Sequence, residues 1–486
     1  MAALLEALAA WPDDELLFAG PGQNWRAAEV RAAVAALGAR LSGANVVAVL
    51  ADNGPAWAIA DLAALTAGCA HLPLPGFFSA GQIEHALEQT AADTVLTDQP
   101  ERIGELDLGF AVTGHWQNLT WLRRPPGAFV LPPGTAKISF TSGSTGAPKG
   151  VCLSAAGLYA TAAALVQRLA GLPLSRHLAA LPLSLLLENV AGLYAPLLRQ
   201  MPVCLLPLAR LGWQGMSGFD PAALQAAVSE AQPGSLILVP ELLKAWSLYL
   251  AASFAASQQR PAASLGYVAV GGARVDRETL NQARALGIPA YQGYGLTECG
   301  SVVAVNMPGD DGDDVGRPLD HAAIRVVDGE VLVLTAAFLG YLGGAQGAKG
   351  AGEFATGDLG HLTADGHLYL SGRRKNLLIT SYGRNISPEW VEAALLAQPA
   401  IMQAVVTGEA EAALSAILAP ISGVGDSDIA AAVAAANETL PDYARVGRWQ
   451  RSPPFSAANG LATGNGRPLR QAIAARFAEA PGQQHE

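Results

Sequence analysis

The amino-acid sequence predicts an α/β protein with a large N-terminal domain of mixed and parallel sheets flanked by helices, a β-rich subdomain and a small α+β C-terminal domain. Two patterns and the length of the chain lead to this prediction. Short apolar strands alternate with turns and alanine-rich helices in the N-terminal part, and near Asp320 the pattern changes to short alternating segments. With 486 residues the chain exceeds the size at which one hydrophobic core stops growing, so we expect at least two domains.

The alternation of strands and helices runs through the large domain. Apolar residues recur at helical spacing from Ala28 to Leu41, and the following NVVAVLADNG predicts a buried strand and a turn. Helices are also expected over residues 155–170 and 276–286. Strands separated by helices indicate mostly parallel sheets. The further short apolar strands are expected over residues 95–97, 137–141, 203–206, 236–239 and 267–270.

The C-terminal part of the chain predicts two smaller units. AIRVVDGEVLVL and HLYLSGRRKNLLIT, separated by a glycine-rich stretch from Gly340 to Gly352, indicate the β-rich subdomain over residues 315–374. NISPEWVEAALLAQ and QAVVTGEAEAALSAILAP then predict helix, strand, turn and strand in a compact unit. We therefore expect a large domain over residues 1–374 and a small domain over residues 375–486.

Composition excludes several classes of partner. The formal net charge of -11 argues against general attraction to nucleic acid or an anionic membrane surface, because both require a clustered positive field. The N-terminal residues MAALLEALAAWPDDELL lack the basic segment of a secretory signal. Prolines and charged residues interrupt the long apolar stretches, so we expect no transmembrane helix and no integral membrane contact.

Cysteine and lysine are both used sparingly. The cysteines form no CxxC pair and no metal-ligand spacing, which favours buried free thiols and a cytoplasmic setting. They are Cys69, Cys152, Cys204 and Cys299. Arginine supplies 25 of the basic residues, and the only lysines are Lys137, Lys149, Lys244, Lys349 and Lys375.

One segment has the features of a phosphate site. KISFTSGSTGAPKG, from Lys137 to Gly150, predicts a strand that opens into a loop of glycine and hydroxyl residues ending at Lys149. Glycines let backbone N–H groups approach phosphate oxygens, hydroxyls add donors and the lysine adds a charge. The spacing differs from GxxxxGK[ST], so this is not a Walker A loop. The residues alone are also compatible with a flexible surface turn.

TSGSTGAPKG resembles the phosphate-binding signature of the adenylate-forming superfamily, which includes acyl-CoA and aryl-CoA synthetases, peptide-synthetase adenylation domains and luciferases. Similar motifs follow in the family's order across nearly the whole chain, and the resemblance is nearest to the acyl- and aryl-CoA ligases. It implies that the loop binds ATP and that Lys149 is catalytic. The matching loop positions are Thr141, Ser142, Gly143, Ser144, Thr145 and Gly146.

Two further motifs resemble the family's adenine site. YVAVGGARV, from Tyr267, implies that adenine lies against the backbone of Gly271, Gly272 and Ala273. YQGYGLTECG, from Tyr291, implies that Tyr294 stacks on the adenine and that Gly295 belongs to the nucleotide site.

The same resemblance implies contacts to the phosphates and the ribose. Thr297 would donate to the α-phosphate and Glu298 would hold magnesium, although an isolated YGxTE segment is equally compatible with a loop carrying a solvated glutamate. In ATGDLGHL, Asp358 would accept both ribose hydroxyls, and Arg373 would contact the ribose as well.

The C-terminal segment departs from the family at one position. Where the family has a catalytic lysine, NGLATGNGRPLR carries Arg467, and no lysine follows Lys375. The family's lysine acts as a cation in the transition state, and arginine has the same charge but is longer, planar and forked. Three interpretations remain open: Arg467 serves as the cation, adenylation is slowed while thiol transfer survives, or catalysis is lost.

LPLSLLLENVAGLYAPLL, from Leu181, resembles the segment beside the family's acid pocket. Many relatives have an aromatic residue or histidine near Leu185, whereas this chain has three leucines, Leu185 to Leu187. If the segment lines the pocket, it favours an apolar acid; ordinary core packing is the alternative.

The resemblance implies that ATP and Mg²⁺ activate an apolar fatty or aromatic acid, that pyrophosphate leaves, and that the acyl group passes to coenzyme A. The small domain would rotate about Lys375 between the half-reactions. Two alternatives remain: loading of the phosphopantetheine arm of a separate acyl carrier protein, and a nucleotide- or acyl-binding relative weakened in catalysis. Arg445, Arg448 and Arg451 either meet the phosphates of CoA or form a solvated basic face.

Overall fold

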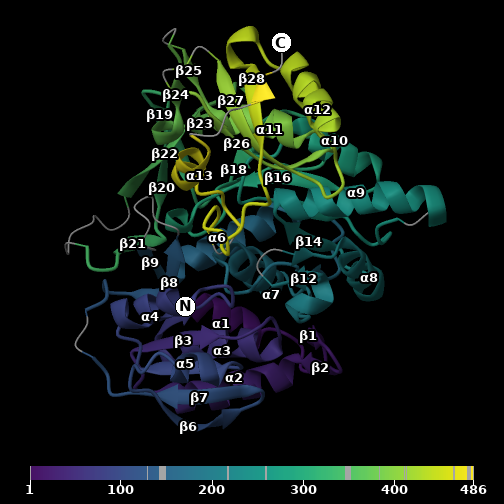
Figure 1. Cartoon of the computed structure of the whole chain (residues 1–486). Coiled ribbons are helices and arrows are strands. Elements are labelled where there is room, and N and C mark those ends of the chain that lie inside the picture. Colours follow the sequence, from purple (N-terminus) through teal and green to yellow (C-terminus); the bar gives the residue numbers. More distant parts are fainter. Residues whose placement is uncertain are drawn as a thin grey trace.

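The computed structural model describes residues 2–127, 130–141, 149–215, 218–257, 260–344, 352–381, 384–409, 411, 413–463, 466–478 and 483–484. The chain folds into a large N-terminal domain and a smaller C-terminal domain, as the sequence predicts (Figure 1). Two large sheets and a four-stranded sheet form the first domain, and the small domain lies at the top of this view. Among the described residues, no helix combines the length and the hydropathy that crossing a lipid bilayer requires.

The first large sheet has eight strands in the order β21-β9-β8-β4-β3-β5-β7-β6. All five residues of β3 (Val46–Leu50) are buried, because helices cover both faces of the parallel centre of the sheet. These helices are α2 (Ala27–Leu41), α3 (Pro55–Ala67), α4 (Ala80–Gln89) and α5 (Pro100–Gly104). The other strands are β4 (Ala70–Pro73), β5 (Thr94–Thr97), β6 (Ala111–Trp116), β7 (Leu119–Arg123), β8 (Thr135–Thr141), β9 (Lys149–Ser154) and β21 (Phe338–Tyr341).

The second large sheet has nine strands in the order β18-β17-β16-β15-β14-β10-β11-β1-β2. Strands β14 (Ser235–Leu238), β15 (Tyr267–Val270) and β16 (Ala290–Tyr294) are parallel, so their carboxyl ends meet at one edge. Open α/β sheets bind ligands at that edge. The other strands are β1 (Leu16–Gly20), β2 (Gln23–Arg26), β10 (His177–Leu178), β11 (Val203–Cys204), β17 (Ala304–Val305) and β18 (Arg317–Pro318).

The remaining elements of this part of the large domain are mainly helical. They are α1 (Ala2–Ala9), α6 (Ala155–Arg168), the π-helical segment η1 (Glu188–Tyr194), α7 (Ala195–Leu198), the 3₁₀ segment η2 (Leu208–Leu211), the short strands β12 (Trp213–Gln214) and β13 (Gly218–Phe219), α8 (Pro221–Ala231), α9 (Pro240–Ser257), α10 (Arg277–Ala285) and the 3₁₀ turn η3 (Thr297–Cys299). The helices and strands that the sequence predicts for the large domain are present within two residues of the predicted bounds, and all four cysteines are buried and free, as predicted.

The C-terminal part contains the two smaller units that the sequence predicts. The four-stranded sheet is antiparallel and consists of β19 (Ala323–Val327), β20 (Glu330–Thr335), β22 (Gly352–Leu362) and β23 (Leu368–Arg373). The small domain has its own buried core, to which α11, α12 and the central strands contribute. Its elements are η4 (Arg374–Asn376), β24 (Leu378–Ile379), β25 (Asn385–Ile386), α11 (Pro388–Leu396), β26 (Ile401–Thr407), β27 (Leu414–Pro420), α12 (Asp426–Glu438), η5 (Asp442–Ala444), β28 (Val446–Arg451), α13 (Arg470–Phe477) and β29 (Gln483–Gln484).

A fully buried carboxylate, that of Asp61 in α3, joins distant elements of the large domain. Lys137 of β8 donates to its Oδ1 at 2.8 Å, and the Tyr194 hydroxyl and Asn189 amide of η1 donate to its Oδ2 at 2.7 and 2.9 Å. Burial by itself would raise the pKa of Asp61, but Lys137 and the nearby His71 hold it below its ordinary value. The strand that leads to the predicted phosphate loop is therefore fixed to η1.

Replacing Lys137 by methionine should destabilise the protein strongly, because Asp61 would remain as a buried charge without its cation. We expect the free energy of unfolding in urea to fall by about 3–5 kcal/mol. The control is Arg210→Met, because Arg210 pairs with Glu230 at the surface, where the side chains are 55% and 69% exposed. That change should cost less than about 1 kcal/mol. Equal losses in the two variants would contradict the prediction.

Candidate active site

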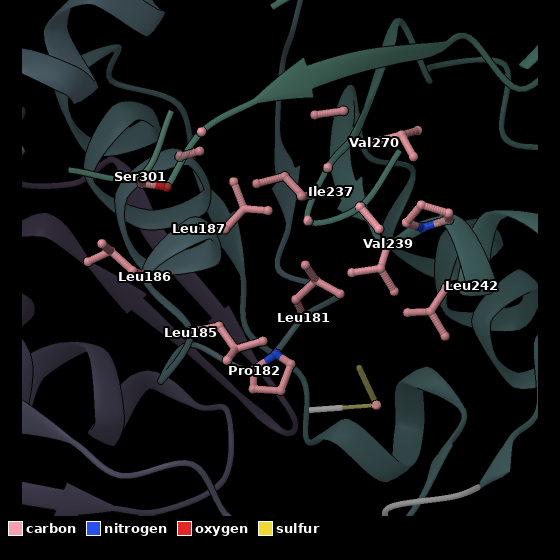
Figure 2. Close-up of a pocket in the computed structure, with 18 of the residues that line it drawn as sticks. Leu181, Pro182, Leu185, Leu186, Leu187, Ile237, Val239, Leu242, Val270 and Ser301 are labelled. Carbon is pink, nitrogen blue, oxygen red and sulfur yellow. The ribbon is translucent and has the colours of Figure 1, made fainter. Parts of the chain in front are cut away.

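A cavity of about 1370 Å³ opens at the carboxyl ends of β14, β15 and β16. Its inner part is apolar. Leu185, Leu186 and Leu187 line the cavity, which is one of the two alternatives that the sequence left open for them. Figure 2 shows side chains from residues 181–187 on one side of this space and aliphatic side chains of β14 and the segment after it on the other: Leu181, Leu185, Leu187, Ile237, Val239 and Leu242.

The turn after β15 supplies one edge of the cavity. Gly271, Gly272 and Ala273 all line it, and Gly272 has φ of 91°, a left-handed conformation that favours glycine. The guanidinium of Arg467, from the small domain, donates a hydrogen bond from Nη2 to the carbonyl oxygen of Gly272 at 3.1 Å. The turn predicted to hold adenine and the predicted catalytic cation are thus in direct contact.

Tyr294, Asp358 and Arg373 form a hydrogen-bonded group in which Tyr294 and Arg373 line the cavity, whereas the buried Asp358 does not. The Tyr294 hydroxyl donates to Asp358 Oδ2 at 2.7 Å, and Arg373 Nε donates to Asp358 Oδ1 at 2.6 Å. Burial and the adjacent Asp358 carboxylate both raise the pKa of Tyr294, so the hydroxyl keeps its proton. Each carboxylate oxygen has a second lone pair, so Asp358 can still accept from a ligand while these two side chains orient it.

The segment after β16 brings Thr297 and Glu298 to the cavity. A Cβ on Gly295 would lie 1.7 Å from the carbonyl oxygen of Ser301, so this position requires glycine. The hydroxyl of Tyr341 donates to Glu298 Oε1 at 2.9 Å. Burial and Glu298 both raise the pKa of Tyr341, which keeps this donor protonated.

Tyr341 is a site residue that the sequence analysis did not identify. It lies in β21, which pairs antiparallel with β9 although the two strands are far apart in the sequence. Its ring centroid lies 5.9 Å from Nζ of Lys149, the first residue of β9. No motif in the sequence indicates this residue, because its position depends on the pairing of β21 with β9.

The ends of the predicted phosphate loop lie side by side in the antiparallel pair of β8 and β9. Thr141 and Lys149 are partners in the register, and the Thr141 hydroxyl donates to the carbonyl oxygen of Lys149 at 3.5 Å. Both residues line the cavity. The predicted loop residues Ser142, Gly143, Ser144, Thr145 and Gly146 lie outside the described residues.

Four cations meet on one side of the cavity. Lys149, Arg373, Lys375 and Arg467 all line it, and Lys375 interacts electrostatically with the other three. Burial, followed by the repulsion from Arg373, Lys149 and Arg467, lowers the pKa of Lys375, although Asp358 opposes this effect. In a chain of net charge -11, such a local concentration of positive charge is suited to a polyanion.

The carboxylate of Glu298 fits a magnesium ion whose other ligands would be phosphate oxygens and water. Among the described residues, no group of three or more His, Cys, Asp and Glu side chains could hold a metal ion. Glu298 presents one carboxylate to the cavity, and Tyr341 occupies only its Oε1. Magnesium is usually held by one or two carboxylates together with substrate phosphates and water, so Glu298 fits such an ion.

Models of protein families match most of the chain. A model described as AMP-binding enzyme matches residues 4–336, and a model described as AMP-binding enzyme C-terminal domain matches residues 375–480.

Several curated proteins are related to the chain in sequence. The 2-succinylbenzoate–CoA ligase of Salmonella typhimurium is 30% identical over 407 residues, which cover 79% of this chain and 78% of the relative. The ligase of the same name from Bacillus velezensis is 32% identical over 300 residues, 58% of each chain. The long-chain-fatty-acid–CoA ligase FadD15 of Mycobacterium bovis is 37% identical over 154 residues, 30% of this chain and 26% of the relative. The last two matches therefore span less than two thirds of those relatives.

Solved structures share the fold over almost the whole chain. O-succinylbenzoate coenzyme A synthetase (MenE) from Bacillus subtilis, in complex with AMP, has a TM-score of 0.76 at 21% identity and covers 99% of this chain and 98% of its own. The anthranilate CoA ligase AuaEII, in complex with anthranoyl-AMP, has a TM-score of 0.81 at 19% identity with the same coverage. The fold class that the sequence predicts and the family resemblance are both confirmed.

Removing the Tyr294 hydroxyl should weaken nucleotide binding, because Asp358 would lose one of the two donors that orient it. We expect Tyr294→Phe to lower the affinity for AMP about tenfold in isothermal titration calorimetry. Tyr291→Phe is the matched control, since Tyr291 lies in the same strand and does not line the cavity. A Tyr294→Phe protein that binds AMP as tightly as the control would refute the assigned role.

Proposed function

This chain belongs to the AMP-binding enzyme family, and we propose that it is an ATP-dependent ligase that activates an apolar carboxylic acid as its acyl-adenylate and transfers the acyl group to coenzyme A. The observation that carries this proposal is the position of the four cations beside an apolar chamber. Lys149, Arg373, Lys375 and Arg467 offer positive charge for a triphosphate, and the leucine-lined part next to them suits the body of an apolar acid.

In the first half-reaction a carboxylate oxygen of the acid forms a bond to the α-phosphorus of ATP. The bond from that phosphorus to the bridging oxygen breaks, and pyrophosphate leaves with the electron pair. Little acid–base chemistry is required, so the protein contributes mainly by positioning and by neutralising charge. Thr297 would donate to the α-phosphate, and the Lys149 ammonium would neutralise charge on the phosphates.

The nucleoside would be held by the residues around the turn after β15. Adenine would lie between the backbone of Gly271 to Ala273 and the ring of Tyr294. Asp358 would accept from the ribose hydroxyls with its remaining lone pairs, and Arg373 holds its carboxylate in place. A magnesium ion held by Glu298 would supply Lewis-acid stabilisation of the charge on the phosphate oxygens.

Arg467 takes the position of the family's catalytic lysine, and we propose that it serves as the cation for adenylation. Its hydrogen bond to Gly272 shows that the longer side chain can reach the cavity from the small domain. It also interacts electrostatically with Arg373, Asp358 and Glu298, the groups assigned to ribose and magnesium. A guanidinium offers several donors in one plane, which suits the oxygens of a carboxylate and a phosphate.

In the second half-reaction the sulfur of coenzyme A would attack the carbonyl carbon of the mixed anhydride, and AMP would leave. We propose that the small domain rotates about Lys375 between the two steps, as in the family that the chain resembles. The domain boundary at Lys375 and the acceptor are parts of this proposal. A free carrier protein as acceptor is the alternative that an experiment must separate.

The acid is proposed to be a fatty or aromatic acid without a second charge in its apolar part. Aliphatic side chains from residues 181–187 and from β14 surround the inner cavity, and an ionic group there would lose its hydration. The names of the relatives include a long-chain fatty acid ligase and a ligase of succinylbenzoate, an aromatic acid with two carboxylates. The test therefore includes fatty acids and aromatic acids with one and with two carboxylates.

The role of Arg467 can be tested by acid-dependent pyrophosphate release. With ATP, Mg²⁺ and a panel of fatty and aromatic acids, the native protein should release pyrophosphate, and Arg467→Met should lower the rate about a hundredfold because a cation of the transition state is lost. Arg467→Lys should retain most of the rate. Arg476→Met, an exposed site in the same domain, is the control and should behave like the native protein. Recovery only in Arg467→Lys would show instead that arginine is the defect.

The acceptor can be tested by supplying either coenzyme A or a holo acyl carrier protein. We expect AMP and the acyl-CoA thioester to form in equal amounts when coenzyme A is present, as measured by mass spectrometry and nucleotide chromatography. Preferential loading of the carrier protein would overturn the proposed acceptor but not adenylation. Binding of ATP without pyrophosphate release from any acid would overturn the proposed enzyme activity.

A further inference from the structure

Lys244 of α9 makes contacts across the boundary between the two domains. Its ammonium donates hydrogen bonds to the backbone carbonyl oxygens of Leu396, Gln398 (2.7 Å) and Ile401, which all belong to the small domain. The residue is 8% exposed. Lys244 is one of only five lysines in the chain, and neither the predicted motifs nor the reaction assigns it a role.

The three acceptors match the chemistry of an ammonium group. Leu396 is the last residue of α11, Gln398 follows the helix and Ile401 begins β26. The ammonium therefore lies at the C-terminal end of the helix, where the last carbonyl groups have no partner within the helix. The negative end of the helix dipole also lies there, so a cation is favoured. A tetrahedral ammonium can direct its three donors at three carbonyl groups around one nitrogen, whereas the planar guanidinium of arginine cannot.

Burial lowers the pKa of Lys244 to about 7. Near neutral pH the side chain is therefore present both as an ammonium and as an amine. The neutral amine has only two N–H donors, so the three hydrogen bonds to the small domain require the ammonium form.

The hydrogen bonds of Lys244 and the hydrogen bond of Arg467 occur in the same arrangement of the two domains. Helix α9 begins directly after β14, and Gly272, which accepts from Arg467, follows the neighbouring parallel strand β15. Both interactions therefore connect the small domain to the same edge of the nine-stranded sheet. A rotation of the small domain about the chain near Lys375 would carry the three carbonyl groups away from Lys244 and Arg467 away from the cavity.

We propose that Lys244 is a positioning residue that holds the small domain in the arrangement in which Arg467 reaches the cavity, and that it thereby favours adenylation over thiol transfer. This inference rests on the proposed two-step ligase function. Lys244 is the side-chain donor to all three carbonyl groups in this arrangement, and the carbonyl oxygen of Gln398 also accepts from the backbone N–H of Ile401. Loss of Lys244 removes the ammonium donor from each of them, whereas in the rotated arrangement water can solvate them. The substitution therefore shifts the equilibrium toward the rotated arrangement.

The test is Lys244→Met, which keeps the length of the side chain and removes its donors. Acid-dependent pyrophosphate release should fall about tenfold or more, whereas thioester formation from coenzyme A and a supplied acyl-adenylate should be unchanged or faster. Lys244→Arg should not restore the native ratio of the two rates. Equal losses in both half-reactions, or no loss in either, would overturn the inference.

Arg176→Met is the matched control for an ordinary loss of stability. Arg176 Nη1 donates to the carbonyl oxygen of Ala231 at 2.9 Å, at the end of α8, so it makes the same kind of contact within one domain. Its loss should lower the melting temperature without changing the ratio of the two half-reactions. A change of the ratio as large as that in Lys244→Met would show that the effect is not specific to the domain contact.

A measurement without turnover separates this inference from the proposed function. Dyes on exposed positions of the two domains, introduced by Glu101→Cys and Asp442→Cys, report the distance between the domains, and the four native cysteines are buried. Lys244→Met should shift the energy-transfer distribution, and Arg176→Met should not. If no acid is activated by any variant but the shift occurs, the proposed function fails and the positional role stands. An unchanged distribution overturns the positional role.

Discussion

A carboxylate without access to solvent must have its charge and its lone pairs matched by protein groups, and Asp61 meets this requirement with side chains from two other segments. Lys137 comes from the strand that enters the phosphate loop, and Asn189 and Tyr194 come from η1, which follows the leucines of the cavity. The proposed triphosphate end and the proposed acid end of the site are thus fixed to one buried charge. The relative position of the two segments depends on this network, because displacing β8 would leave Asp61 without its cation and displacing η1 would remove two hydrogen bonds from it.

The site combines a rigid half with a half that can move. Gly271 and Thr297 follow the parallel strands β15 and β16, and Tyr294 ends β16, where it pairs antiparallel with β17. Arg467 comes from the small domain and joins the cations on one side of the cavity. Under the proposed rotation of the small domain, the charge in the site would change between the two half-reactions.

Basic side chains are concentrated at the cavity, although the chain as a whole has a negative net charge. The cations at the cavity would repel one another without a ligand, and the lowered pKa of Lys375 records that repulsion together with burial. Asp358 and Glu298 offset part of it, and Tyr294 and Tyr341 hold these carboxylates with hydroxyl groups that burial keeps protonated. The energy of this repulsion is relieved when a polyanion binds, which favours a triphosphate over a neutral ligand.

The sequence by itself predicted the strands and helices, because apolar periodicity is a local property of the chain. Its motifs proposed most of the candidate site residues through their resemblance to the adenylate-forming superfamily. Tertiary structure alone decided that Tyr341 meets Glu298, that Lys375 joins the cation cluster and that Lys244 reaches α11. Glu188 illustrates the difference: in the sequence it interrupts an apolar stretch, whereas in the fold it is fully buried and lies 2.8 Å from His177. Such contacts depend on the pairing of strands and the packing of domains that lie far apart in the sequence, and no local pattern encodes the distance between two side chains that only the fold brings together.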